Sequence, residues 1–181
     1  MLTLAENPPI TFPIATPVAE MHGTWWVAHT KSRQEKAFAH ELAGKGISYF
    51  LPLVEKVTII RGRKFRPLLP LFPGYVFACG DAESRLQMFG GNRIARTIPV
   101  VDQSRLVGEL TQIQKALEAE ATFDPWPYLR EGRRCRVTAG PFIGIEGLIT
   151  RRKDITRLVL TIDLLGQSVA LEIDASLLEP V

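Results

Sequence analysis

The last fifty residues of this 181-residue chain constrain its fold more than any other stretch. Residues 140–147 hold three glycines, with a proline directly after the first, a composition typical of a sharp turn that a Cβ would hinder. Short alternating runs flank this turn, and we expect strands at residues 134–137, 147–151, 158–164 and 168–173. Because the stretch has no helical pattern to cover them, the strands must bury an apolar face against one another. We therefore predict a small β-barrel over residues 131–181.

This arrangement resembles the KOW module, an SH3-like barrel of transcription and translation proteins, which directs attention to nucleic-acid machinery. Phe142 and Ile143 occupy the tip of the glycine-rich turn. They either form an apolar patch for a partner, or Phe142 folds back over the barrel end, and both interpretations stay open. The runs at residues 158–162 and 169–173 are β-branched and alternate, which favours strands. We expect no helical resting state for this domain.

Composition excludes several classes of protein. The longest apolar run, residues 68–79, is interrupted by two prolines and is shorter than the ~20 residues that a membrane-spanning helix needs. Residues 1–23 carry four prolines, two glutamates and no Lys or Arg, so we expect a disordered tail and no secretory signal. Cys79 and Cys135 match neither a disulfide framework nor a metal-site spacing. We expect a monomeric, reduced, cytoplasmic protein that does not associate with membranes.

The net charge of +3 is distributed unevenly along the chain. Residues 24–105 hold thirteen Lys or Arg against six Asp or Glu, whereas residues 106–131 hold two against five. A basic domain beside an acidic connector predicts an anionic partner for that domain. A basic surface that is merely solvated remains the alternative.

The boundary between two domains follows from the helix pattern. Apolar residues recur at helical spacing over residues 106–120, which predicts an amphipathic helix. Pro125 and Pro127 then prevent its continuation. We predict a first domain at residues 24–120, a short linker at residues 121–130 and the barrel after it.

The first domain alternates predicted strands and helices. We expect strands at residues 24–29, 47–54, 74–78 and 96–101 and helices at residues 32–43 and 81–88. Ser32 and Glu35 have the spacing of a capping box at the start of the first helix. Residues 55–69 suit a hairpin arm with its tip at residues 61–64. This order predicts an α+β fold, an antiparallel sheet with flanking helices followed by the small barrel.

Several of these elements together carry a more specific resemblance. Trp-Trp-Val at residues 25–27, a basic helix start at residues 31–33 and Leu-Phe-Pro-Gly-Tyr-Val at residues 71–76 precede the glycine-rich barrel. From residue 24 onward, the chain resembles the NusG family of bacterial transcription elongation and antitermination factors. Residues 51–53, 61–64 and 70–73 look closer to the specialised paralogue RfaH, whereas the barrel is similar to the housekeeping form. The resemblance implies a specialised antiterminator with an ordinary β-barrel.

The resemblance also implies a polymerase-binding surface. In the family, the N-terminal domain docks on the clamp helices of the RNA polymerase β′ subunit and suppresses pausing or termination. Carried over by motif, the candidate docking residues are Trp26, His29, Phe72, Tyr75 and Phe77. Tyr75 and Phe77 share a strand face by alternation, and the alternative is that these aromatics are core. RfaH has a His-Thr-Thr element that contacts the β subunit, whereas residues 85–88 here are Arg-Leu-Gln-Met, so a second contact would need different chemistry.

Basic residues supply candidates for contact with DNA or nascent RNA near the polymerase. They lie at the first helix and on the hairpin: Lys31, Arg33, Lys36, Arg61, Arg63, Lys64 and Arg66. Such groups neutralise phosphates without reading sequence, although a solvated hairpin tip is the alternative. The resemblance implies that the barrel recruits the termination factor Rho or a small-subunit ribosomal protein.

No pattern in the sequence supports an enzyme. The glycine-rich turn lacks the Gly-Lys-Ser/Thr of a phosphate-binding loop, and no Gly-x-Ser-x-Gly is present. His22, His29 and His40 are not spaced as metal ligands. We therefore expect no catalytic residue, cofactor or metal. The alternative function is a ribosome-associated or RNA-binding KOW protein that does not act on polymerase, which would not carry the domain around residues 72–75.

Overall fold

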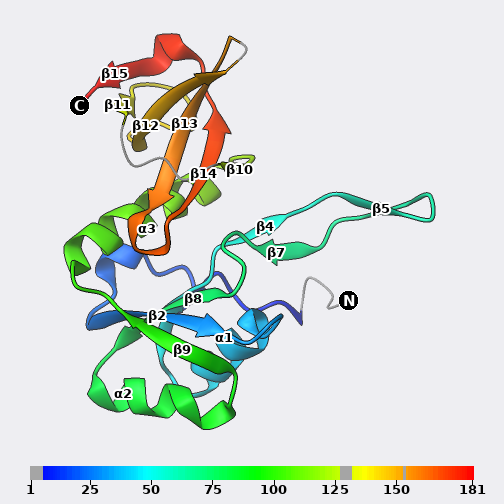
Figure 1. The fold of residues 1–181 in the computed structure, drawn as a ribbon, viewed down its shortest axis with the longest axis vertical. Coiled ribbons are helices and arrows are strands. Elements are labelled where there is room, and N and C mark those ends of the chain that lie inside the picture. The colour runs from blue at the N-terminus through cyan, green and yellow to red at the C-terminus, as the bar shows by residue number, and fades with distance from the viewer. Residues whose placement is uncertain (1–5, 127–131, 153) are drawn as a thin grey trace. The chain divides into compact units, whose positions relative to one another are not determined.

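The computed structural model describes residues 6–126, 132–152 and 154–181 (Figure 1). The chain divides into two compact units, Met1–Gln103 and Ser104–Val181. Within the described ranges, no helix is both long and apolar enough to cross a membrane.

The first unit is built on a five-stranded antiparallel sheet in the order β1-β3-β8-β2-β9. Its strands are β1 (Thr11–Phe12), β3 (Ser48–Phe50), β8 (Tyr75–Gly80), β2 (Thr24–Thr30) and β9 (Ile94–Pro99). The helices are α1 (Glu35–Gly44) and α2 (Ala82–Gln87), with the short 3₁₀ helices η2 (Val18–Glu20) and η3 (Met88–Gly91). The predicted α+β class is confirmed.

Both faces of the central strands are buried. On one face, Trp26 of β2 and Val76 of β8 pack in a cluster with Phe38 and Leu42 of α1. On the other face, Val27 and Phe77 are cross-strand partners, and both are fully buried. Strands buried on both faces read as continuous apolar runs, as residues 25–28 and 76–79 do.

The expected disordered tail is wrong for residues 6–23. Strand β1 pairs with β3, and Val18 of η2 is fully buried. The Tyr49 hydroxyl donates to the Pro9 carbonyl over 3.0 Å. Prolines and absent basic residues suggested disorder, but the apolar residues between the prolines pack on the sheet.

The predicted capping box does not form. Helix α1 begins at Glu35, its N-cap Gln34 makes no side-chain cap bond, and Ser32 is exposed outside the helix. Arg33 has a positive φ of 58°, which interrupts the helical path between Ser32 and Glu35. The Glu35 carboxylate is used elsewhere, as described below.

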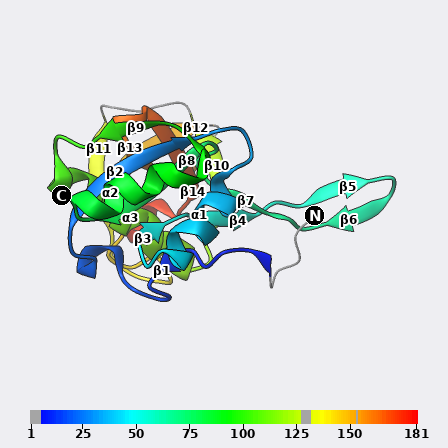
Figure 2. The ribbon, with the colours of Figure 1, turned by 90° about the horizontal axis from the view of Figure 1, so that it is seen from below.

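Residues 53–70 form a long two-stranded arm that projects from the sheet of the first unit (Figures 1 and 2). At its base, β4 (Leu53–Glu55) pairs with β7 (Leu68–Pro70), and further out β5 (Thr58–Ile60) pairs with β6 (Arg63–Phe65). The strand predicted at residues 47–54 is thereby split in two. Pro52 lies at the break, where it has no N–H to continue a ladder.

The second unit contains helix α3 (Gln103–Glu118), apart from its first residue, and a six-stranded antiparallel sheet in the order β10-β14-β13-β12-β11-β15. The strands are β10 (Asp124–Trp126), β14 (Gln167–Glu172), β13 (Ile155–Ile162), β12 (Glu146–Arg152), β11 (Arg133–Val137) and β15 (Leu178–Pro180). The four predicted strands are present within a few residues, so residues 131–181, as far as they are described, form strands and not the helical hairpin that some relatives adopt. β10 and β15 are additional outer strands.

Part of the predicted linker belongs to this sheet. Pro125 of β10 pairs with Val169 of β14, and the Arg157 guanidinium lies 5.1 Å from the Trp126 ring centroid. An outer strand tolerates proline because one of its edges makes no ladder bonds. Residues 127–130 of the predicted linker lie outside the described residues.

Helix α3, expected to close the first domain, groups with the second unit. The Glu146 N–H donates to Gln112 Oε1 over 2.9 Å, and Arg105 pairs with Asp163 at 3.1 Å. The Asp163 N–H donates to Glu109, and burial raises the pKa of the Glu109 carboxyl. The compact units therefore divide at Gln103, whereas a functional boundary at residue 120 stays a prediction.

Candidate functional sites

His29 and Tyr75 form one paired surface on the first unit. They are cross-strand partners in the β2–β8 ladder, and their rings stack at 5.0 Å between centroids with planes 25° apart. Both side chains are half-buried, so each keeps part of its surface open to solvent. Arg96, the exposed β9 partner of His29, lies on the same face. This surface combines aromatic and cationic groups.

The other three predicted docking residues are buried. Trp26 is 7% exposed, Phe72 is 1% exposed and Phe77 is fully buried. The Phe72 and Phe77 rings meet edge to face at 6.2 Å. Trp26 lies on the helix-covered face, opposite His29. Strand alternation could have separated Trp26 from His29 in the sequence, because residues three apart in a strand point to opposite faces.

A buried carboxylate holds the turn that precedes Tyr75. Glu35, 8% exposed, accepts a hydrogen bond from the Gly74 N–H over 2.7 Å. The Gly74 carbonyl in turn accepts from the Thr30 N–H over 2.8 Å. Gly74 has a φ of +87°, a conformation in which a side chain would be strained. Glu35 thus ties helix α1 to the Phe-Pro-Gly-Tyr turn, a role that sequence reasoning missed by assigning it to a cap.

The basic residues near α1 have different surroundings. Lys31 donates to Asn92 Oδ1 over 2.7 Å, and Arg33 is exposed in the loop before the helix. Lys36 donates to the Leu68 carbonyl over 2.6 Å. Desolvation lowers the pKa of Lys36, opposed by the nearby Glu35 charge. Lys36 therefore anchors the base of the arm, in addition to any role toward an anionic partner.

The turn predicted at the end of the arm is confirmed, and it consists of two residues. Ile60 pairs with Arg63, and the intervening Arg61 and Gly62 have φ values of 48° and 76°. Two positive φ values define the type I′ geometry that matches the twist of a hairpin. Arg61, Arg63 and Lys64 are exposed. Arg66 is also exposed, and it pairs with Glu55 at 3.1 Å.

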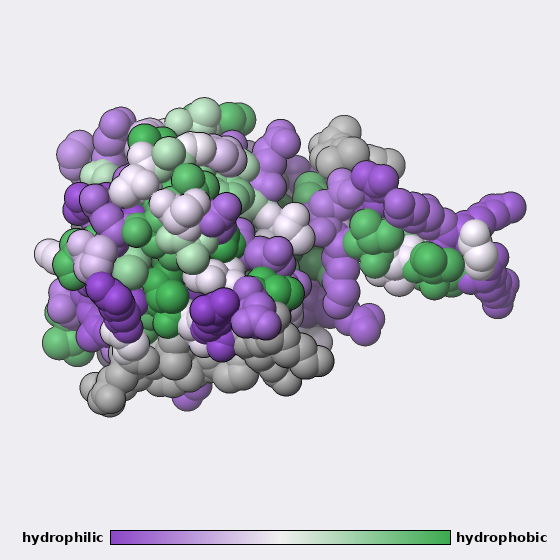
Figure 3. Space-filling view, turned by 90° about the horizontal axis from the view of Figure 1, so that it is seen from above, coloured by the Kyte–Doolittle hydropathy of each residue, from purple (hydrophilic) through white to green (hydrophobic). Residues whose placement is uncertain are grey.

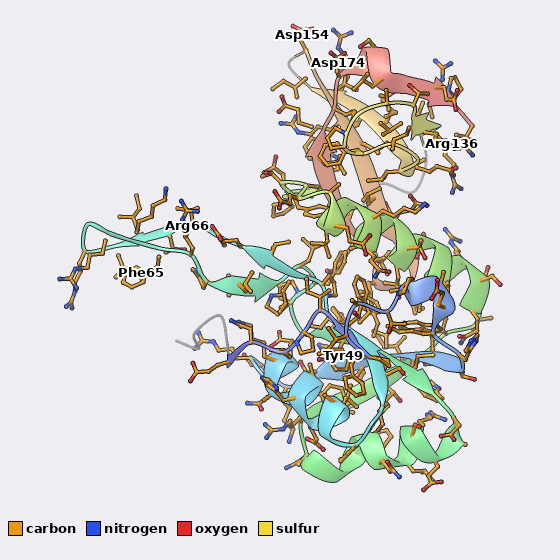
Figure 4. All side chains as sticks on the ribbon, turned by 180° about the vertical axis from the view of Figure 1, so that it is seen from behind. Tyr49, Phe65, Arg66, Arg136, Asp154 and Asp174 are labelled. Carbon is orange, nitrogen blue, oxygen red and sulfur yellow. The ribbon has the colours of Figure 1, made fainter. Side chains whose placement is uncertain are left out.

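The arm also exposes apolar residues that sequence reasoning did not use. Val57, Ile59 and Ile60 are 52%, 71% and 45% exposed. Figure 3 shows hydrophobic residues among strongly hydrophilic ones along the arm. In Figure 4, the side chains of Phe65 and Arg66 point to opposite sides of the ribbon, as alternation requires. The signal in the sequence was a β-branched run at residues 57–60 opposite a basic strand.

In the second unit, the glycine-rich turn presents an apolar residue. Ile143 is 64% exposed, whereas Phe142 is half-buried. The Gly144 N–H donates to the Val137 carbonyl over 2.8 Å, and Gly140 and Gly144 both have positive φ values. Ile143 is thus the more accessible of the two residues at the tip of this turn.

Residues 85–89 present two exposed apolar side chains. Leu86 is 74% exposed and Phe89 is 49% exposed, whereas Met88 is buried in the core cluster. Residues three apart on a helical segment share a face. Leu86 and Phe89 therefore form a small exposed apolar surface on the first unit.

Metal chemistry finds no support in the described ranges. Among those residues, no group of three or more His, Cys, Asp or Glu side chains is arranged to hold a metal ion. Cys79 and Cys135 are both buried and free, and burial raises the pKa of the Cys79 thiol to about 11. A thiol that is buried and protonated at neutral pH is a poor nucleophile.

Comparison with known proteins gives the family. The model of the family described as "Transcription termination factor nusG" matches residues 23–119. A Borreliella burgdorferi protein named "Transcription termination/antitermination protein NusG" is 25% identical, covering 89% of this chain and all of the relative.

Two solved structures are also similar at low identity. One, titled "Domain interaction in Thermotoga maritima NusG", has a TM-score of 0.44 at 18% identity and covers 87% of this chain and 97% of its own. The other, titled "Crystal Structure of MjSpt4:Spt5 complex conformation B", has a TM-score of 0.27 at 15% identity and covers 87% and 96%. Since the family model spans more than half of the chain, this protein belongs to the NusG family of transcription factors, which are not enzymes.

Proposed function

We propose that this protein binds RNA polymerase through its first domain and acts as an elongation or antitermination factor. The observation that carries the proposal is the family match over residues 23–119, the range that contains the stacked His29–Tyr75 pair. Members of the family bind RNA polymerase. By the resemblance of the Phe-Pro-Gly-Tyr turn, the docking target is the clamp helices of the β′ subunit.

The half-buried pair is well suited to docking. His29 and Tyr75 each have a polar tip and an apolar ring, the kind of side chain that dominates interface energetics. Phe77, two residues along on the same strand face, is fully buried, and the Glu35–Gly74 hydrogen bond holds the turn before Tyr75. A surface that is already ordered loses little entropy on binding. Trp26, Phe72 and Phe77 support this surface from the core.

The arm and the loops supply further contacts in this proposal. The exposed Arg61, Arg63 and Lys64 contact DNA or nascent RNA phosphates near the polymerase, together with Lys31, Arg33 and Arg66. The KOW-like second domain recruits Rho or a small-subunit ribosomal protein through Ile143 and Phe142. We further propose a specialised, RfaH-like role, supported by the resemblance of residues 51–53, 61–64 and 70–73.

Retention of the full chain on immobilised bacterial core RNA polymerase tests the proposal. Wild type is retained, and isolated β′ clamp helices release it by competing with the polymerase. The variant that combines His29→Ala with Tyr75→Ala is not retained. Ile143→Ala, which truncates an exposed apolar side chain in the second unit, is the control and retains binding. Ribosome or RNA binding by wild type without polymerase retention would favour the alternative of a KOW-type RNA-binding protein.

A further inference from the structure

The outer part of the arm, residues 57–66, carries more than positive charge. Strand β6 carries basic residues and one aromatic residue, Phe65. Its partner β5 consists of β-branched residues. We define these ten residues as the arm tip. Phosphate contact alone would require only the basic side chains, so the aromatic and apolar residues invite a separate explanation.

The register places Phe65 beside apolar and cationic neighbours on one face. Phe65 is the cross-strand partner of Thr58, and Ile60 is the partner of Arg63. Since partners and alternate residues share a face, Thr58, Ile60, Arg63 and Phe65 lie together. Ile59 and Lys64, also partners, occupy the other face. The first face is therefore an aromatic and aliphatic surface with a guanidinium next to it, toward the turn.

The base of the arm holds this face in place. β4 pairs with β7, Leu53 is buried in the core cluster, and Lys36 donates to the Leu68 carbonyl. An isolated two-stranded ribbon is only marginally stable, so these anchors matter for the geometry of the tip. Phe65 belongs to the two-stranded β5–β6 sheet, outside the five-stranded sheet, and is only half-buried. Its ring keeps accessible surface.

We propose that the arm tip binds single-stranded nucleic acid, with a base stacked on Phe65 and adjacent phosphates paired with Arg61 and Arg63. Every base has a π-face, and a single strand exposes it, whereas a duplex hides it in its own stack. Aromatic rings beside basic groups are the combination that binds single strands without sequence preference. This inference rests on the nucleic-acid contact in the proposed function and specifies the form of nucleic acid that the arm tip takes.

The test measures binding of the full chain, without polymerase, to fluorescently labelled oligonucleotides of about 12 units, a length within the usual site size of single-strand binders. Oligo-dT, oligo-U and a duplex of the same length are compared by anisotropy over a series of salt concentrations. We expect both single strands to bind more tightly than the duplex. Loss of one stacked base corresponds to about a tenfold loss of affinity, so Phe65→Ala weakens single-strand binding by that factor.

Four further variants separate the contribution of stacking from that of charge. Phe65→Trp retains single-strand binding because it keeps a π-face, whereas Phe65→Leu keeps apolar bulk and loses affinity. Ile59→Ala, on the opposite face, is the matched control and binds as wild type. Replacing Arg61, Arg63 and Lys64 with Gln reduces the slope of log K against log salt by about 2, whereas Phe65→Ala leaves that slope unchanged.

Several results would overturn the inference. If Phe65→Ala binds as wild type while the triple Gln variant is weakened, the tip contacts phosphates only. If the duplex binds as tightly as the single strands, the preference for exposed bases is absent. If no oligonucleotide binds at low salt, the arm tip contacts another class of partner. None of these results bears on polymerase retention, which tests the proposed function separately.

Discussion

Two antiparallel strand pairs of the first unit follow the same side-chain alternation but differ in burial. In the β2–β8 pair, apolar residues on both faces are buried, including Trp26, Val27, Val76 and Phe77. In the β5–β6 pair, Ile59 and Ile60 are exposed beside Arg63 and Lys64. Strand alternation decides which residues share a face, but only the surrounding structure decides whether that face is covered.

The two phenylalanines Phe77 and Phe65 show what this difference means for function. Phe77 packs between Phe50 and Phe72, with centroids at 6.3 and 6.2 Å. Phe65 lies on a ribbon that projects from the sheet (Figure 4). An aromatic side chain in the core contributes to stability, whereas the same side chain on the arm is available to a partner.

Replacing the core aromatic has the largest expected effect. Phe77→Ala removes a fully buried ring from an aromatic cluster and lowers the free energy of unfolding by about 3–5 kcal/mol. Phe65→Ala lowers it by about 0.5 kcal/mol or less. Urea unfolding followed by Trp25 and Trp26 fluorescence, in a Trp126→Phe background, measures both. Equal losses of stability would show that the arm is as much a part of the core as the central sheet.

The hydrogen bond that positions Tyr75 gives the next effect. Glu35→Ala leaves the Gly74 N–H without its acceptor and lowers the free energy of unfolding by about 1–3 kcal/mol. Polymerase retention falls with it, because the turn before Tyr75 loosens. Glu35→Gln keeps an acceptor oxygen and is the matched control. A Glu35→Ala protein as stable as Glu35→Gln would mean that the bond is dispensable.

The anchor at the base of the arm comes third. Lys36→Met keeps the stem but removes the donor to the Leu68 carbonyl, lowering the free energy of unfolding by about 1 kcal/mol. Lys64→Met, on the exposed tip, changes it by less than about 0.5 kcal/mol. The same urea experiment compares the two. If Lys64→Met lowers the free energy of unfolding as much as Lys36→Met, the distinction between anchor and tip is wrong.

Neutralising the basic residues of the arm tip has the smallest expected effect on stability but changes nucleic-acid binding. Combined Arg61→Gln, Arg63→Gln and Lys64→Gln leaves the free energy of unfolding within about 0.5 kcal/mol of wild type, because all three side chains are exposed. Nucleic-acid affinity falls and depends less on salt. Unfolding and anisotropy on the same preparation measure both. An unchanged salt dependence would remove the arm tip from nucleic-acid contact.

Much of the fold followed from the sequence because its signals are local. Backbone freedom and side-chain alternation within a few residues determine the glycine-rich turn and the strands around it. They also determine the two-residue turn at Arg61-Gly62. The elements that were missed depend on distant partners. Strand β1 forms by pairing with β3, nearly forty residues away, and β10 forms by pairing with β14. Proline counts near each segment suggested a tail and a linker, but pairing outweighed them.

The candidate site divides along the same line. The sequence by itself determined the family motifs, the basic hairpin and the shared face of Tyr75 and Phe77. Only the tertiary structure decided that Phe77 is core while Tyr75 stays half-open beside His29, and that Glu35 bonds to Gly74. The physical reason is that burial is a property of what packs over a residue. Neither composition nor periodicity within one strand carries that information.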